Sequence, residues 1–454
     1  MSNQEAILGA AASLCPVCLK RIPARNVAAG DDVYQEKTCP EHGRFRTIIW
    51  RGPPSYLSWG AAAQPPAGDA ATDNDCPFDC GLCPGHRRQT CCVLLEVTQR
   101  CNLGCPVCFA GAGGKAVDPD LATVESWYRR LLVHGGPYNI QLSGGEPTLR
   151  DDLPEMIALG KSLGYSFFQL NTNGLRLAED QPYGLRLKQA GLSCVFLQFD
   201  GLDDTVYEKI RGKALLAIKK AAIARCAELG LGVVLVPTLV PGINTAQIGR
   251  LVDFAVSLMP AVRGVHFQPV SYFGRYPQPP ADADRFTLPE LMRAIEAQTG
   301  GKMKTGDFRP SGARNAYCAF HANYLVAADG GLKLLNNGDG KGCCQSVPAA
   351  DGVRKARSFV ARRWSAAGSA RTDSPACCPG VDTGSLDAFL DTVDQRSLCI
   401  SAMAFQDSGT IDTARLKDCP LHVLHPDGRL IPFCAYNLTD MRGEPLYRPR
   451  SVTP

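Results

Sequence analysis

Residues 96–109 read EVTQRCNLGCPVCF and place the thiols of Cys101, Cys105 and Cys108 in a C-x3-C-x2-C spacing. The first cysteine comes just after the apolar run 93–98, whose composition predicts a β-strand. Three thiolates can hold an iron–sulfur cluster and leave one iron open to another ligand, whereas four thiolates close the cluster. A zinc knuckle is the alternative, because cysteines at these spacings also suit zinc.

From residue 91 onward, short apolar runs alternate with amphipathic stretches, a pattern typical of repeated βα units and a parallel sheet. Six strands are expected, at residues 93–98, 138–142, 167–171, 194–199, 233–239 and 264–269. Five helices are expected between them, at residues 123–133, 152–163, 183–190, 213–229 and 245–258. Six units are two fewer than a closed eight-stranded barrel has. The sequence therefore predicts an α/β fold, a partial (β/α)6 barrel over residues 91–300, with its chemistry at the C-terminal ends of the strands.

The turn after the second expected strand contains Gly144, Gly145 and Glu146. Glycines let the backbone approach a ligand closely, and a carboxylate accepts hydrogen bonds from an ammonium group. By itself, such a Gly-containing turn is common in loops. At this position, downstream of the cysteine motif, it resembles the Gly-Gly-Glu element of the radical S-adenosylmethionine (SAM) superfamily, which the three-cysteine motif also resembles.

This resemblance implies the roles of several residues. In the superfamily, the open iron of a 4Fe-4S cluster chelates the amino and carboxylate groups of SAM, and Phe109 occupies the usual aromatic position after the third cysteine. Glu146 would accept hydrogen bonds from the SAM ammonium group. The polar residues after the third and fourth strands would bind the ribose and carboxylate of SAM: Asn171, Asn173 and Asp200. Asn-Gly and Asp-Gly turns are the structural alternative for these three, and His266 could pack on adenine or be a buried structural histidine.

The amino-acid composition limits which classes of protein the chain can belong to. Twenty-one cysteines in 454 residues need either an oxidising compartment or metal. Residues 1–14 contain no basic residue and only a short apolar run, so they do not predict a signal peptide, and no run approaches about 20 apolar residues. We therefore expect a cytoplasmic protein with reduced, largely metal-bound thiols. The net charge of +4 is too small to indicate nucleic acid binding.

A second C-x3-C-x2-C triplet, Cys76, Cys80 and Cys83, lies upstream of the first strand. It predicts an auxiliary 4Fe-4S cluster with Cys92 or Cys91 as the fourth ligand. Because it precedes the strand instead of following it, it is not expected to be the SAM site.

The N-terminal head, residues 1–60, carries Cys15, Cys18 and Cys39, with His42 or a more distant cysteine completing four ligands. This pattern predicts a zinc-ribbon or rubredoxin-like site for one zinc or iron ion, since sulfur-rich tetrahedral sites suit both metals. Residues 61–90 are expected to form a linker and the auxiliary-cluster loop.

Residues 301–454 are expected to form a separate C-terminal auxiliary-cluster region. Its expected ligands are Cys399, Cys419 and Cys434, with Cys344 or Cys318 as a possible fourth. The alternative is that several of these thiols are small buried apolar groups. Cys194 and Cys226 fall inside an expected strand and an expected helix, and we assign both to the core.

The cysteine head, the tandem triplets and three C-terminal stretches, ISAMAFQD (400–407), DCPLHV (418–423) and IPFCAYN (431–437), resemble one family closely. It contains the archaeal tetraether lipid synthases and the 7,8-dihydro-6-hydroxymethylpterin methylating proteins. The resemblance implies several iron centres and reductive cleavage of SAM to a 5′-deoxyadenosyl radical that attacks an unactivated C–H carbon. It also implies an electron donor such as flavodoxin or ferredoxin.

The substrate stays open at this stage. Carbon–carbon bond formation on lipid chains is the leading hypothesis, which would bring peripheral membrane contact, and methylation of a pterin-like small molecule is the alternative. Radical modification of a peptide or RNA is a further possibility. An iron–sulfur electron carrier or a zinc-ribbon nucleic acid protein, neither of which would bind SAM, represents the competing class.

Overall fold

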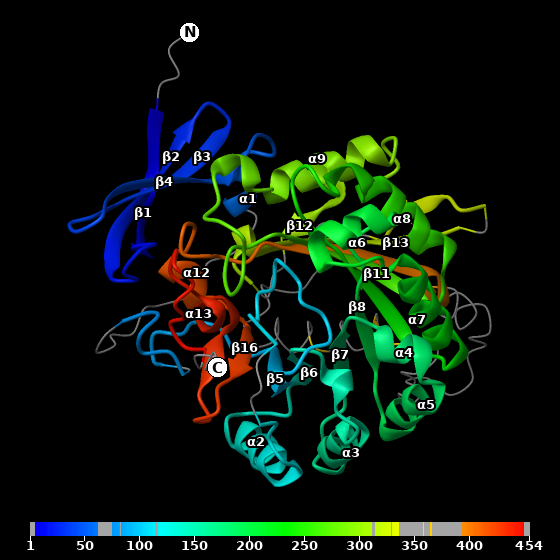
Figure 1. Cartoon of the computed structure of the whole chain (residues 1–454). Helices are drawn as coiled ribbons and strands as arrows, with labels where there is room; N and C mark the ends of the chain where they lie inside the picture. The colour runs from blue at the N-terminus through cyan, green and yellow to red at the C-terminus, as the bar shows by residue number, and fades with distance from the viewer. Residues whose placement is uncertain are drawn as a thin grey trace, which may run out of the picture.

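The computed structural model describes residues 5–61, 75–81, 83–113, 117–310, 314–327, 329–335, 357, 364–365 and 393–448. The expected linker around residue 70 and the candidate ligand Cys344 lie outside these ranges. The described residues form a four-stranded antiparallel sheet and a 13-stranded mixed sheet (Figure 1).

The four-stranded sheet is the N-terminal head, drawn in blue in Figure 1. Its strands pair in chain order and are β1 (Glu5–Leu14), β2 (Arg21–Ala29), β3 (Asp32–Cys39) and β4 (Gly43–Trp50). The short helix α1 (Tyr56–Ala61) follows. Turns between consecutive strands bring the two ends of the head's cysteine pattern together, as described below.

The larger sheet confirms the six expected parallel strands. They are β5 (Cys92–Thr98), β6 (Asn139–Gly144), β7 (Phe168–Thr172), β8 (Cys194–Gln198), β9 (Gly232–Val236) and β11 (Val262–Pro269), with β10 (Thr238–Leu239) beside β11. Side chains alternate between the two faces with a period of two. On β5, Val93, Leu95 and Val97 join the main apolar core, whereas Leu94 belongs to another cluster. The face of Leu94 and Glu96 is the barrel interior.

The helices lie on the outer face of this sheet (Figure 1). Five match the prediction: α2 (Leu121–Val133), α3 (Leu153–Ser162), α5 (Gln181–Ala190), α7 (Leu216–Glu228) and α8 (Ile248–Ser257). Two short helices were not expected, α4 (Leu175–Glu179) and α6 (Asp204–Arg211), and α9 (Leu288–Gln298) follows the barrel. The outer face of the sheet and these helices bury one continuous core.

C-terminal strands lengthen the barrel sheet at both ends. At one end, β15 (Ser397–Met403) pairs parallel with β11, and β13 (Ala319–Val326) pairs antiparallel with β15. At the other end, β16 (Leu421–Leu424) pairs parallel with β5. The remaining elements of this region are β12 (Arg309–Pro310), β14 (Leu332–Leu334), α12 (Thr413–Lys417), β17 (Leu430–Pro432) and α13 (Phe433–Asn437). An open sheet exposes unpaired backbone groups at its edges, and the added C-terminal strands pair with the edges of the barrel. The sheet therefore continues past the boundary that the sequence predicted at residue 300.

Buried polar contacts join the head to the barrel. The ammonium group of Lys37 on β3 donates to the hydroxyl of Ser13 at 3.0 Å and to the backbone carbonyl of Ser408 at 2.7 Å. The amide of Met441 donates to the carbonyl of Pro16 at 2.8 Å. The head is therefore fixed to the C-terminal segment that pairs with both ends of the barrel sheet.

Candidate functional site

Cys101, Cys105 and Cys108 lie in the loop after β5, at the C-terminal end of the sheet. Cys105 is buried, and the other two thiols are half-buried. Apolar side chains surround the loop, among them Leu103 and Tyr207. Burial raises the pKa of Cys101 to about 11. Burial also raises the pKa of Cys105, and because thiolates are the iron ligands, a bound cation would favour the ligating form of both thiols.

The segment after β11 holds this loop in place. The backbones of Arg275 and Cys108 exchange two hydrogen bonds, each 2.9 Å long. The guanidinium of Arg275 donates to the carbonyls of Cys105 at 2.9 Å and Ala112 at 3.2 Å. Gly274 has φ +69°, and a Cβ there would overlap the carbonyl oxygen of Cys108. Arg275 and Gly274 therefore pin the second half of the cysteine loop, a role that the sequence did not suggest.

The glycine pair at the end of β6 packs against the first half of the same loop. The amide of Gly145 donates to the carbonyl of Thr98, and the amide of Glu146 donates to the carbonyl of Arg100, both at 2.8 Å. A Cβ at Gly144 would overlap the carbonyl oxygen of Thr98, and one at Gly145 would overlap that of Arg100. The two glycines are therefore required for the close approach of two backbones.

The carboxylate of Glu146 is only 2% exposed and accepts four hydrogen bonds from the protein. The donors are the amide (3.1 Å) and hydroxyl (2.6 Å) of Thr148, the hydroxyl of Thr172 (2.6 Å) and the amide of Asn173 (2.7 Å). Glu146 thus joins the turns that follow β6 and β7. Its contact with the SAM ammonium group stays a prediction.

Asp200 forms a buried ion pair behind the cysteine loop. Both of its oxygens accept hydrogen bonds from Arg211 at 2.8 Å, and the amide of Thr238 donates to one of them at 3.0 Å. The Arg211 charge in turn lies beside Cys105, where it lowers the thiol pKa against the larger, raising effect of burial. Asp200 is fully buried. Its observed partners are protein groups, whereas the sequence predicted ribose hydroxyls.

Lys219 is a further buried cation that the sequence did not single out. From α7, its ammonium group donates to the carbonyl of Asn173 and to Oε1 of Gln198 at 3.3 Å. Burial lowers the pKa of Lys219 to about 8. The Asn173 side chain donates to Oδ1 of Asn102, between two of the cysteines, at 2.7 Å. Asn173 therefore connects the cysteine loop to α7.

The other predicted cofactor contacts occupy the barrel wall and its rim. Asn171 points along the interior face and donates to Gln141 at 3.4 Å. His266 is buried beside the hydroxyl of Ser401, 2.9 Å from its Nδ1, and burial lowers its pKa to about 3. Phe109 is 37% exposed, with its ring centre 5.6 Å from that of Phe433.

The head contains a compact donor set. One donor atom from each of Cys15, Cys18, Cys39 and His42 lies within 4.8 Å of the others. Nδ1 of His42 is 3.5 Å from the sulfur of Cys39 and 3.7 Å from that of Cys15. Three sulfurs and one imidazole nitrogen suit a tetrahedral zinc ion. Of the two fourth ligands that the sequence left open, the structure places His42 there.

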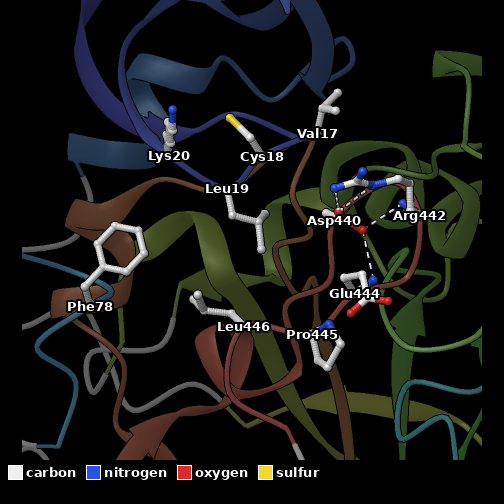
Figure 2. A pocket seen from close by; sticks show the side chains of 10 residues that line it. All are labelled: Val17, Cys18, Leu19, Lys20, Phe78, Asp440, Arg442, Glu444, Pro445 and Leu446. Atoms are coloured by element: carbon white, nitrogen blue, oxygen red, sulfur yellow. Dashed lines mark hydrogen bonds and ion pairs between the residues drawn. The ribbon is translucent and has the colours of Figure 1, made fainter. Parts of the chain in front are cut away.

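A pocket borders this donor set (Figure 2). Figure 2 shows Leu19 of the head and Leu446 of the C-terminal segment facing the same hollow, with Phe78 at its side. Asp440 accepts hydrogen bonds from the guanidinium of Arg442 at 3.1 Å and the amide of Glu444 at 2.9 Å, which orders the C-terminal wall. The pocket therefore marks the junction of the head, the second cysteine triplet and the C-terminal segment.

Comparison with known proteins identifies the family. Residues 95–255 match the model of the radical SAM superfamily, and residues 7–51 match that of the HMPTM N-terminal zinc ribbon domain. The chain is 34% identical over 470 residues to 7,8-dihydro-6-hydroxymethylpterin dimethyltransferase of Methanocaldococcus jannaschii, covering 94% of this chain and 92% of that protein. The chain belongs to the radical SAM superfamily. It is a radical SAM enzyme, and its family implies a 4Fe-4S cluster and SAM.

Two further likenesses cover less of this radical SAM enzyme. A probable GTP 3′,8-cyclase of Methanococcus aeolicus is 29% identical over 191 residues, which is 41% of this chain and 62% of the cyclase. The crystal structure of Streptococcus suis SuiB bound to S-adenosylmethionine is 18% identical, with a TM-score of 0.38 and 47% coverage of each chain.

In this radical SAM enzyme, the second triplet lies close together before β5. Cys76 and Cys80 are buried and Cys83 is half-buried. The hydrogen bond between Cys80 and Cys76, followed by burial, raises the pKa of the Cys80 thiol. The predicted fourth ligand Cys92 lies on the interior face of β5, beside Gln141, and it belongs to the same apolar cluster as Cys76 and Cys80. The strand alternation directs it into the barrel.

A third group of thiols lines a cavity next to β16. The cavity is lined by Cys318, Cys419 and Cys434, together with residues that include Phe405 and Phe433. Burial raises the pKa of Cys419 to about 11. Cys399 does not line this cavity; it lies on β15, in register with Gly264 and Asn323. The cavity thus brings Cys419 and Cys434 together with Cys318, which the sequence offered as a fourth ligand, and not with Cys399.

Within the described ranges, the radical SAM enzyme has no helix that is long and apolar enough to cross a membrane.

Proposed function

We propose that this radical SAM enzyme methylates a carbon atom of a pterin-like small molecule. The observation that carries the proposal is the similarity over 92% of a relative whose name specifies 7,8-dihydro-6-hydroxymethylpterin dimethylation. The similarity includes both the head and the barrel, so it extends beyond the SAM-binding core that many radical SAM enzymes have in common.

The barrel interior also favours a polar substrate over a lipid chain. Interior positions near the strand ends carry Glu96, Gln141, Asn171, Gln198 and Gln268. A lipid chain is accommodated by an apolar channel, because polar groups that lose water without gaining a partner destabilise the complex. A pterin ring offers hydrogen-bond donors and acceptors along its edge. Coupling of lipid chains, the leading hypothesis from the sequence, is therefore replaced by its alternative.

Cys101, Cys105 and Cys108 would hold the 4Fe-4S cluster, which fits a loop of three thiols enclosed by apolar side chains. With SAM bound and an electron supplied, this cluster provides a 5′-deoxyadenosyl radical that removes hydrogen from a substrate carbon. Arg275 and the Gly144–Gly145 pair keep the loop in one conformation, and the apolar surroundings exclude water. A flavodoxin or ferredoxin would donate the electron.

Two auxiliary clusters complete the proposal. The Cys76, Cys80 and Cys83 triplet would hold one cluster, and the cavity thiols Cys318, Cys419 and Cys434 would hold the other. The head would hold one zinc ion.

The test is anaerobic turnover of the reconstituted protein with SAM, dithionite and 7,8-dihydro-6-hydroxymethylpterin. We expect 5′-deoxyadenosine and a pterin product that is heavier by one or two methylene units. Methyl-deuterated SAM identifies whether SAM also donates the methyl group or a separate one-carbon donor is required. Cys105→Ala is the matched control and should give neither product. Cleavage of SAM with an unchanged pterin under every methyl donor would refute pterin methylation and leave the radical SAM chemistry standing.

A further inference from the structure

The barrel wall contains a buried acceptor to which no other described residue donates a hydrogen bond. Gln169 on β7 is 1% exposed, and its Nε2 donates to Oδ1 of Asn171 at 2.7 Å. Nδ2 of Asn171 donates in turn to Oε1 of Gln141 on β6 at 3.4 Å. Among the residues that the structure describes, none donates a hydrogen bond to Oε1 of Gln169. A buried polar atom left without a partner costs about 1–3 kcal/mol, so this atom points to a ligand.

Flat rings lie next to this row of amides. Phe196 on β8 is the register neighbour of Asn171. Its ring centre is 4.7 Å from that of Trp364 and 5.8 Å from that of His266 on β11. The indole N–H of Trp364 is a buried donor that likewise has no hydrogen-bond partner within the described ranges. The unsatisfied acceptor lies on β7, the strand paired with that of Phe196, and the unsatisfied donor belongs to the ring packed on Phe196.

We propose that Gln169 reads the 2-amino-4-oxopyrimidine edge of the pterin ring, whose face lies against Phe196. The edge presents the amino group and the ring N–H as donors and the carbonyl and ring nitrogens as acceptors. Oε1 of Gln169 accepts a hydrogen bond from the amino group, and Asn171 and Gln141 hold the Gln169 amide in the orientation that leaves Oε1 free. The Trp364 indole donates to a ring acceptor. The assignment rests on the proposed function and adds the residue that sets its specificity.

The arrangement of the hydrogen bonds makes the row of amides selective. Each carboxamide offers two N–H donors and an acceptor oxygen. In the row from Gln141 through Asn171 to Gln169, the oxygen of Gln169 is the acceptor left without a donor among the described residues. A site built to bond a donor rejects an analogue that lacks it far more strongly than a site of apolar contacts does. The 2-oxo analogue of a pterin, a lumazine, replaces the amino donor with an acceptor oxygen that would face Oε1.

The test is a binding measurement that needs no turnover. We would titrate the anaerobic, cluster-loaded protein with 6-hydroxymethylpterin and with 6-hydroxymethyl-lumazine and follow ligand fluorescence. The wild type is expected to prefer the pterin by about tenfold or more, equivalent to one hydrogen bond gained and one repulsive pair avoided. Gln169→Met, which is similar in shape but has no acceptor, should reduce that preference to within about threefold.

Two controls guard the interpretation. Gln181→Met, on the exposed start of α5, should keep the full preference. The far-UV circular dichroism spectrum and the iron content of Gln169→Met should match those of the wild type, which separates the loss of a hydrogen bond from a general loss of fold. A Gln169→Met protein that still prefers the pterin as strongly as the wild type would overturn the assignment. If the wild type binds neither ligand, the proposed function itself fails, because the protein then has no pterin site for Gln169 to recognise.

Discussion

Arg275 shows why only part of the candidate site could be predicted from the sequence. The three cysteines and the Gly-Gly-Glu turn were predicted because their spacing is local. Arg275 follows the last barrel strand by a few residues and gains its role only when β11 brings it beside the loop after β5. The same holds for Lys219, since a lysine on an amphipathic helix normally belongs to its solvated face, yet this one is buried.

Arg275→Met is expected to loosen the cysteine loop without emptying it. The variant removes the side-chain hydrogen bonds to Cys105 and Ala112 but keeps the backbone pairing with Cys108. We expect near-normal iron and sulfide content. The affinity for SAM should fall by about tenfold, because the two lost hydrogen bonds are together worth about 1–2 kcal/mol. Adding SAM should also change the EPR spectrum of the reduced cluster less than it does in the wild type. Arg129→Met, on the exposed face of α2, is the control. An EPR response to SAM equal to that of the wild type would contradict the positioning role.

Lys219 predicts a pH dependence of stability. Its pKa is lowered by burial from about 10.4 to about 8 in the folded protein. Between these two values the unfolded chain binds more protons than the folded chain, so the free energy of unfolding rises with pH across this window. Relative to Lys219→Met, the wild type should gain about 2–3 kcal/mol between pH 8 and 10.4 in urea denaturation of the metal-free protein, at 1.36 kcal/mol per pKa unit. Lys220→Met, an exposed neighbour on α7, is the control, and a flat difference for Lys219→Met would count against its burial.

At the scale of elements, the six barrel strands were predictable because each is a short apolar run between turn signals. The helices α4 and α6 were missed because they are only 5 and 8 residues long, and each directly follows a turn residue, Gly174 or Asp203. The strands β15 and β16 were missed for a different reason. Which strand pairs with an open sheet edge depends on contacts between residues that are hundreds of positions apart, and local periodicity does not contain that information.

The contact between the β6 turn and the cysteine loop is an element-scale prediction. In Gly145→Ala the new Cβ would overlap the carbonyl of Arg100, so the turn must move away from the loop before Cys101. We expect SAM affinity, measured by equilibrium dialysis on cluster-loaded protein, to fall by tenfold or more, a loss of at least about 1.4 kcal/mol. Gly306→Ala, whose Cβ would meet nothing within 4 Å, should bind SAM normally. Wild-type affinity in Gly145→Ala would mean that the two backbones need not touch.

At the scale of the whole molecule, the head, the barrel and the C-terminal segment are joined by buried polar contacts. The sequence predicted the head's metal site but not its attachment, because Lys37 and Ser13 carry no pattern that indicates a partner almost 400 residues away. The sheet continues through the C-terminal strands, on both sides of the boundary that the sequence predicted at residue 300.

The head should bind one zinc ion per chain, independently of the barrel iron. We expect plasma mass spectrometry to find one zinc per chain in the wild type and almost none in a Cys18→Ser/Cys39→Ser double variant, while the iron content stays unchanged. Cys226→Ala removes a buried core thiol on α7 and should retain the zinc. Because the head contacts the 408–411 and 441 segments, the double variant should also be cleaved faster by protease near its C-terminus. Iron in place of zinc in the head would show that the four donors select the other metal.

The placement of β15 and β16 at opposite ends of one sheet has a consequence for biosynthesis. The ribosome makes Cys101, Cys105 and Cys108 about 290 residues before it makes β15. At about 5–20 residues per second, that interval lasts roughly 15–60 s. During this time the nascent barrel has both edges uncovered, and the three thiols proposed to hold the cluster are already present. A cluster inserted into these thiols during that interval would enter a sheet whose two edges, next to β5 and β11, have not yet been covered by β16 and β15.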